Sequence, residues 1–321
     1  MMVARALALA AGAYGALDLI SRGLVRRAEM VDPEEAVPPG KISRIDGLAV
    51  HHVERGEGPP AVLVHGYAAS SFSFRETIPA LAPRFRVLAV DLPGFGYSDR
   101  SLQHDLSLDA QVRVLQRWME AQRVTGALVV GHSMGGTIAM RLAVAQPALV
   151  ERLVLVGAPE PDWLRQGARL RPLLRPMRPL VRISVLLGTT TTRLSMRRLV
   201  YDRTHLTRPV LAGYRRPRRI KGSIAAIERM LRFTANDRPV SPAEVRQPAL
   251  LLWGEHDRTV PLGRGKRLAE SLPDAELVVI PKAGHLVPEE RPAETNAALL
   301  RWIEETDARR AGARETAAES L

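Results

Sequence analysis

The chain has 321 residues, of which 46% are hydrophobic, and a formal net charge of +12 at pH 7. A chain of this length and composition can bury a large core, which excludes an intrinsically disordered protein. It contains no cysteine, so disulfide frameworks, thiolate metal sites and cysteine nucleophiles are also excluded.

The first 27 residues predict a helix with one apolar side. Apolar residues recur at helical spacing, and Arg5, Asp18, Arg22 and Arg26 fall mostly on the other side. The apolar window between Arg5 and Asp18 is too short to span a bilayer comfortably. A basic amphipathic helix that lies on a membrane surface fits the arginines best. Two alternatives stay open: a signal peptide with a cleavage site near Ala11–Ala13, and an extension that packs on the domain or stays mobile.

After a linker at residues 32–40, which is rich in proline and acid, short apolar strands alternate with helices. The hairpin signal Asp46-Gly47 lies between two strand-like runs in residues 42–54. Further strands are predicted at 61–65, 86–91, 127–130, 153–157, 249–254 and 277–280, and helices at 72–81, 106–122 and 134–145. This alternation predicts an α/β fold with a mostly parallel central sheet and helices on both faces.

One stretch combines a strand, a tight turn and a helix around a serine. Gly131-His132-Ser133-Met134-Gly135 is a G-x-S-x-G nucleophile elbow between the strand at 127–130 and the helix at 134–145. In such a turn the serine is held in a strained conformation with Oγ exposed, and glycines stand where a Cβ would collide. The three fixed residues also occur by chance. The flanking strand and helix therefore carry the prediction that Ser133 is a nucleophile.

Five stretches of the chain, in order, resemble the α/β-hydrolase superfamily. They are VLVHGYAASSFSF, VDLPGFGYSDRS, VVGHSMGG, LLWGEHDRTVP and IPKAGHLVPEERP, and the likeness covers roughly residues 42–307. The resemblance implies the α/β-hydrolase fold with a helical cap inserted into its core. The expected divisions are an N-terminal helix and linker at 1–40, the core at 41–158 and 241–307, the cap at 159–240, and a disordered tail at 308–321.

The resemblance also implies a catalytic triad of Ser133, Asp257 and His285, in the order that this fold uses. His285 would take the proton of Ser133, while Asp257 would hold the imidazole and stabilise its cationic form. Some relatives keep the acid after the preceding strand, so Glu160 or Asp162 stays an alternative to Asp257.

The oxyanion hole is expected to use two backbone N–H groups. One belongs to Met134, at the N-terminus of the helix after the serine, and the other to Tyr67, which follows His65-Gly66. Relatives that open epoxides or displace halide place an aspartate at the nucleophile position. Because this chain has Ser133 there, those two reactions are disfavoured.

The positive charge is concentrated in the predicted cap. Residues 158–240 hold eighteen arginines and Lys221 against five acidic residues, which is an excess of fourteen positive charges. A solvated surface, attraction to anionic lipid and attraction to an acidic substrate all stay open as explanations. We do not expect nucleic acid as a partner, because aromatic residues are only 4% of the chain and no stacking platform is visible.

Many apolar residues accompany the arginines of the cap, and apolar walls dominate small-molecule sites. The expected substrate is therefore a small to medium, uncharged and moderately hydrophobic acyl compound. Neither cofactor nor metal is expected, because no phosphate loop, dinucleotide fingerprint or metal-ligand spacing is present. The leading prediction is a cytoplasmic serine hydrolase of carboxylic esters, with peripheral membrane association. Hydrolysis of amide, lactone, thioester or carbon–carbon bonds, and a ligand sensor with little turnover, stay open as alternatives.

Overall fold

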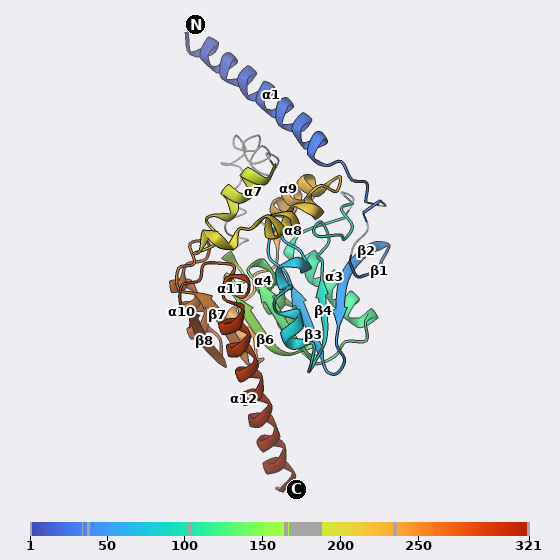
Figure 1. Cartoon of the computed structure of the whole chain (residues 1–321), viewed down its shortest axis with the longest axis vertical. Helices are drawn as coiled ribbons and strands as arrows, with labels where there is room; N and C mark the ends of the chain where they lie inside the picture. The colour runs from blue at the N-terminus through green and yellow to red at the C-terminus, as the bar shows by residue number, and fades with distance from the viewer. Residues whose placement is uncertain are drawn as a thin grey trace.

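An eight-stranded sheet forms the centre of the molecule (Figure 1). The computed structural model describes residues 2–33, 35–36, 39–101, 104–163, 166, 188–233 and 236–319. The strands are β1 (Lys41–Ile45), β2 (Leu48–Arg55), β3 (Pro60–Val64), β4 (Arg86–Val90), β5 (Ala127–His132), β6 (Val150–Val156), β7 (Ala249–Gly254) and β8 (Ala275–Ile280). Their order is β1-β2-β4-β3-β5-β6-β7-β8, and all neighbours from β4 to β8 in this order pair in parallel. The predicted mostly parallel sheet is thus confirmed.

The antiparallel edge of the sheet is the predicted hairpin. Ile45 of β1 pairs with Leu48 of β2, which leaves Asp46 and Gly47 as a two-residue loop. Both loop residues have positive φ, 50° and 84°, as a type I′ turn requires. The sequence Asp-Gly meets this requirement at low cost, and it therefore fixes the register of the hairpin.

Each central strand sends alternate side chains into two apolar layers. Val62 and Val64 of β3 point into one layer, Ala61 and Leu63 point into the other, and all four are fully buried. Burial of one such valine or leucine side chain contributes about 1.5–3 kcal/mol. The first layer is covered by α3 (Leu108–Ala121), α4 (Met134–Ala145) and α10 (Leu262–Ser271), and the second by α2 (Ile78–Leu81), α11 (Val287–Glu290) and α12 (Pro292–Glu319).

Two predicted elements differ from the structure. The helix expected at 72–81 is split into a 3₁₀ turn, η1 (Ser71–Phe74), and the short α2, because Pro79 fits only the first turn of a helix. Residues 308–319, expected in a disordered tail, continue α12. This stretch is rich in alanine, arginine and glutamate, which favour helix, and Arg310 pairs with Glu151 at 2.5 Å.

The long insertion between β6 and β7 carries helices, as expected of a cap. Its described helices are α7 (Gly188–Met196), α8 (Arg208–Arg218) and α9 (Ser223–Phe233), which lie together at one end of the molecule in Figure 1. A small apolar cluster of its own includes Met196 and Leu211, together with Leu286 of the core. The apolar residues expected in the cap between 167 and 187 lie outside the described residues.

Helix α1 (Met2–Ala28) extends away from the sheet, and its far end lies well clear of the domain in Figure 1. Its near end is attached to the cap: the Glu29 carboxylate accepts the backbone N–H groups of Gly222 and Ile224, at 2.9 and 2.7 Å. These are the free N–H groups at the start of α9, where a negative charge is favoured. Among the described residues, no helix combines the length and apolar composition needed to cross a bilayer.

A buried histidine in β2 makes the fold sensitive to acid. The His52 ring is 1% exposed, packs edge-on against Trp118 with 5.3 Å between ring centroids, and has no hydrogen-bond partner at either nitrogen among the described residues. Burial, as the largest cause, lowers the pKa of His52 to about 4. Because an unfolded histidine titrates near 6.5, the unfolded chain binds more protons between pH 6.5 and 4. Titration of His52 therefore does not change the free energy of unfolding above pH 6.5. Below pH 6.5 the free energy of unfolding falls, and this loss continues toward pH 4.

The variant His52→Phe, which keeps an aromatic ring against Trp118 but cannot take a proton, tests this dependence. Urea denaturation at pH 7 and pH 4.5 should show a smaller loss of unfolding free energy in the variant than in the wild type. The expected difference is on the order of 2 kcal/mol. His256→Gln, at an exposed histidine, serves as the control and should follow the wild type. If His52→Phe and the wild type lost the same unfolding free energy between pH 7 and pH 4.5, His52 would not be the source of the acid sensitivity.

Candidate active site

Ser133 occupies the sharp turn between β5 and α4. Its φ of 52° and ψ of −121° lie in a region that residues with a side chain rarely adopt. The Ser133 N–H donates to the carbonyl of Val156 at 2.8 Å, so the end of β6 holds the turn. The side chain itself is half-exposed. Ser133 therefore combines a strained backbone with a partly exposed side chain, and its role as a nucleophile stays a prediction.

The glycines around the serine are required by close approach of backbone. A Cβ on Gly131 would lie 2.5 Å from the Cα of Gly136. A Cβ on Gly135 would collide with the carbonyl oxygen of Val64, at the end of β3. These contacts place the start of α4 against two strand ends, and they explain why glycine stands at both positions of the motif.

His285 and Asp257 form a buried pair. His285 Nδ1 lies 2.7 Å from Asp257 Oδ2, and both residues are at most 5% exposed. The other carboxylate oxygen of Asp257 accepts the backbone N–H groups of Thr259 and Val260, at 2.7 and 2.9 Å. The Asp257 side chain is thus fixed by the loop after β7, and it can hold the imidazole in one orientation.

The alternative acids lie elsewhere. Glu160 pairs with Arg264 at 2.9 Å, and Asp162 accepts from the guanidinium of Arg141 at 3.5 Å and from the backbone N–H of Val240 at 3.2 Å. Only Asp257, of the three candidates, is paired with His285. The geometry therefore favours the acid in the loop after β7.

The loop after β3 lies directly against the serine. A Cβ on Gly66 would be 3.1 Å from the Cβ of Ser133, so the following residue, Tyr67, stands beside the nucleophile. The side chain of Tyr67 turns away, and its hydroxyl donates to the carbonyl of Ile227 in the cap. Met134 is the first residue of α4, where a backbone N–H has no acceptor within the helix. The predicted oxyanion donors thus stand on two sides of Ser133.

Two further histidines support these loops. His65 Nε2 accepts the N–H of Leu92 at 3.0 Å, and its Nδ1 donates to the carbonyl of Gly66 at 2.8 Å, which holds the loop before Tyr67. His132 Nε2 donates to the carbonyl of His285 at 2.9 Å. Burial, as the largest cause, lowers the pKa of His132 to about 4, so its ring is neutral at pH 7. A neutral ring there avoids repelling a positive charge on His285.

A cavity of about 240 Å³ opens over these groups. It lies between the core loops and the cap, and most of its wall is apolar. Its lining residues are Gly66, Tyr67, Ala68, Ala69, His132, Ser133, Met196, Leu199, Tyr214, Arg218, Thr259, His285 and Leu286. Ser133 and His285 therefore line one cavity, of a size that suits a small substrate.

Sequence reasoning did not identify the cap side of this cavity. Met196 and Leu199 are members of the apolar set expected in the cap, but nothing in the pattern singles them out. Arg218 is one of eighteen arginines in residues 158–240, and Leu286 directly follows His285 in the histidine motif. The packing of α8 against the core loops decides which of these side chains line the site.

Comparison with known proteins identifies the family of the chain. A family described as "alpha/beta hydrolase fold" matches residues 59–292. The uncharacterised hydrolase YugF of Bacillus subtilis (strain 168) is 33% identical over 268 residues, which cover 80% of this chain and 95% of YugF. The 2-hydroxy-6-oxo-6-phenylhexa-2,4-dienoate hydrolase of Comamonas testosteroni is 28% identical over 276 residues, 82% of this chain and 94% of that enzyme.

A solved structure shows the same architecture. A mutant of the meta-cleavage product hydrolase CumD from Pseudomonas fluorescens IP01, complexed with acetates, superposes with a TM-score of 0.69. It is 25% identical, and the match covers 83% of this chain and 98% of that one. With a family match over most of the chain and a relative at 33% identity, this protein belongs to the α/β-hydrolase fold family and is a hydrolase.

Proposed function

We propose that the protein is a serine hydrolase that cleaves carboxylic esters through an acyl-enzyme. The observation that carries the proposal is the buried Asp257–His285 pair, whose histidine lines the same cavity as a serine with a strained backbone. A serine hydroxyl becomes a strong nucleophile only when a base takes its proton, and His285 is the base that this cavity offers. The mechanism calls for no cofactor or metal.

In the proposed first half-reaction, Ser133 Oγ attacks the ester carbonyl and His285 Nε2 takes the hydroxyl proton. Asp257 accepts from His285 Nδ1–H and stabilises the imidazolium. The N–H groups of Tyr67 and Met134 donate to the oxyanion of the tetrahedral intermediate. His285 then returns the proton to the departing alkoxide, which leaves as the alcohol and leaves the acyl group on Ser133.

In the second half-reaction, His285 takes a proton from water, and the resulting nucleophile attacks the acyl carbonyl. Collapse of the second tetrahedral intermediate breaks the bond to Ser133 Oγ, which regains its proton from His285. The acid product then leaves the cavity. Met196, Leu199 and Leu286 form apolar walls, so we propose an acyl group with a largely apolar body.

Turnover of a panel of p-nitrophenyl esters, together with labelling by a fluorophosphonate probe, tests this proposal. An esterase should release p-nitrophenol catalytically and should lose that activity when labelled. Stoichiometric labelling with negligible turnover would instead indicate a ligand sensor built on the same fold. The absence of both labelling and turnover would contradict a serine hydrolase of any kind.

Hydrolysis of a carbon–carbon bond is the second candidate, because the similar Comamonas testosteroni protein is named as a hydrolase of a 2-hydroxy-6-oxo dienoate. The two candidates differ in substrate rather than in the residues proposed here. Parallel assays with a 2-hydroxy-6-oxo-dienoate and with simple esters separate them. A kcat/KM that is higher for the dienoate by several orders of magnitude would favour carbon–carbon cleavage.

We also propose that α1 binds anionic membrane surfaces. Leu19 and Ile20 are 72% and 57% exposed, and Arg22, Arg26 and Arg27 are exposed on the same helix. Apolar side chains that insert at the head-group boundary, with arginines beside anionic lipid, each contribute modestly to binding. Each basic residue near such a surface is worth on the order of 1 kcal/mol.

Co-sedimentation with vesicles tests this interaction. The wild type should bind vesicles that contain anionic lipid and should not bind neutral vesicles. Binding should be lost at high salt, because salt screens the attraction. The double variant Leu19→Ser, Ile20→Ser should bind more weakly and keep its esterase activity, because neither residue lies near the cavity. Equal binding to neutral vesicles, or no binding at all, would refute the electrostatic interaction.

A further inference from the structure

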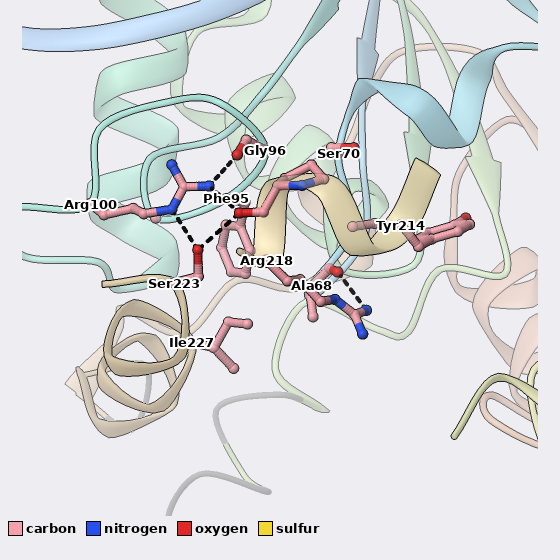
Figure 2. A pocket seen from close by; sticks show the side chains of 12 residues that line it. Ala68, Ser70, Phe95, Gly96, Arg100, Tyr214, Arg218, Ser223 and Ile227 are labelled. Carbon is pink, nitrogen blue, oxygen red and sulfur yellow. Dashed lines mark hydrogen bonds between the residues drawn. The ribbon is translucent and has the colours of Figure 1, made fainter. Parts of the chain in front are cut away.

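Among the described residues, one cation lies in the wall of the proposed active site without a negative partner. Arg218 is the last residue of α8, and its side chain lines the cavity that Ser133 and His285 face. One of its terminal nitrogens donates to the carbonyl of Ala68 at 3.0 Å, as Figure 2 shows. Its Nε is buried and has no hydrogen-bond partner in the described part of the chain. A guanidinium has five N–H donors, so most of its capacity is unused.

The charge of Arg218 is not balanced by an acid that the structure describes. Burial lowers the pKa of Arg218, and the groups that oppose this effect are the hydroxyls of Tyr214 and Tyr67 rather than carboxylates. In the described part of the chain no Asp or Glu lies within ion-pair distance of Arg218. An arginine keeps its charge at pH 7 even so, because a guanidinium loses its proton only in strongly alkaline solution. A partly buried cation of this kind is costly unless a ligand supplies the missing charge.

Another buried arginine of this region, Arg100, makes four hydrogen bonds. Arg100, also visible in Figure 2, donates to the carbonyls of Gly96, Ser98 and Pro217 and to the hydroxyl of Ser223. Its role is to join the core loops to the cap. Arg218 differs because it has one carbonyl acceptor among the described residues and faces the substrate cavity.

The neighbouring polar groups cannot act as the counter-ion. Tyr214, one turn before Arg218 on α8, donates its hydroxyl to Glu289. Glu289 in turn pairs with Arg75 at 2.5 Å and lies 3.7 Å from the ring of His205. The carboxylate of Glu289 is therefore already paired with other groups, while Arg218 lines the cavity without a carboxylate partner among the described residues.

We propose that Arg218 is an anion-binding subsite and that the natural acyl group carries a carboxylate at its far end. This inference rests on the proposed function, because it specifies the substrate of the same site. Arg218 donates to the carbonyl of Ala68 and lines the cavity that also holds Ser133, so its charge lies within reach of a substrate bound there. A carboxylate can accept two parallel N–H bonds from a guanidinium, which fixes the chain in one orientation.

This subsite changes the substrate expected from the sequence. The apolar walls hold the body of the acyl chain, as expected, but one end of the cavity favours negative charge. The excess of fourteen positive charges in residues 158–240 fits this inference, because it would attract an anionic substrate to the cap side. The substrate class is then esters of an acid that bears a second carboxylate, such as half-esters of dicarboxylic acids.

A pair of substrates of equal shape tests the proposal. Mono-p-nitrophenyl glutarate ends in a carboxylate, and p-nitrophenyl 5-methylhexanoate ends in two methyl groups of similar volume. The wild type should prefer the glutarate, mainly through a lower KM. In Arg218→Met, kcat/KM for the glutarate should fall by about 10- to 100-fold and that for the neutral ester by less than about threefold, as expected for loss of a charge-assisted pair. Arg219→Met, at an exposed arginine of the same run, should leave both values unchanged.

Other outcomes overturn the subsite. An equal loss for both esters in Arg218→Met would show that Arg218 only supports the loop at Ala68. Equal kcat/KM for the two esters in the wild type would show that the cavity does not discriminate between a charged and a neutral acyl group. Calorimetric binding of free glutarate tests the subsite separately from the proposed reaction. Suppose that the wild type hydrolyses neither ester but binds glutarate, and that Arg218→Met does not bind it. The subsite would then be supported, and the proposed esterase function would be wrong. If the wild type did not bind glutarate and hydrolysed both esters equally well, the anion-binding subsite would be wrong and the proposed esterase function would stand.

Discussion

Replacement of Ser133 by alanine is expected to lower kcat/KM for p-nitrophenyl esters by at least about 10³-fold, because the proposed acyl-enzyme forms on the hydroxyl of Ser133. Ser133 and His285 line the same cavity, and the mechanism proposed here transfers the hydroxyl proton between them. Alanine has the same Cβ as serine, so the strained turn should tolerate the change. Initial rates of p-nitrophenol release give the comparison.

Two controls accompany this variant. Ser271→Ala removes the hydroxyl of an exposed serine at the end of α10 and should leave the rate unchanged. The thermal midpoint of Ser133→Ala should stay near that of the wild type, which excludes unfolding as the cause. If Ser133→Ala kept more than a tenth of the activity, the nucleophile would have to be another residue.

Asp257→Asn is expected to lower kcat by about 10²- to 10⁴-fold while the fold is retained. The carboxylate accepts from His285 Nδ1 through one oxygen and from the N–H groups of Thr259 and Val260 through the other. An asparagine would keep its carbonyl oxygen on those two N–H groups and present its NH₂ to the imidazole. That arrangement favours the tautomer with a proton on Nε2, which cannot accept the proton of Ser133.

Glu160→Gln is the matched control for the acid. It makes the same chemical change at the alternative position, where the side chain pairs with Arg264 and is partly exposed. The expected loss of kcat is less than about threefold, since such surface pairs contribute little. If Glu160→Gln lost more kcat than Asp257→Asn, the acidic residue of the triad would be Glu160, in the loop after β6.

Much of the fold and the arrangement of the site could be predicted from local sequence. Ala127–His132 and Ala249–Gly254 are continuous apolar runs that end in turn residues, and such runs predict buried parallel strands well. The proposed nucleophile and acid each lie just after one of these strands. Because the carboxyl ends of parallel strands meet at one edge, residues 124 positions apart come together. His285 joins them from the loop after β8.

The cap face of the site could not be predicted in the same way. Arg215, Arg216, Arg218 and Arg219 form one run at the C-terminal end of α8, and the sequence does not distinguish them. Only the rotation of α8 against the core places Arg218 in the cavity and leaves Arg216 and Arg219 exposed. The helix at 308–319 was missed for a related reason, since its link to the core is an ion pair between residues far apart in sequence.

Mass spectrometry of the acyl-enzyme tests the central claim most directly. The protein is mixed with a p-nitrophenyl ester, quenched in acid during turnover and digested with trypsin. Cleavage after Arg123 and Arg141 gives a peptide of residues 124–141 in which Ser133 is the only serine. Acyl transfer through Ser133 predicts one adduct, of the mass of the acyl group, on this peptide and at this residue. Steady turnover with an adduct on a different residue would contradict the mechanism proposed here.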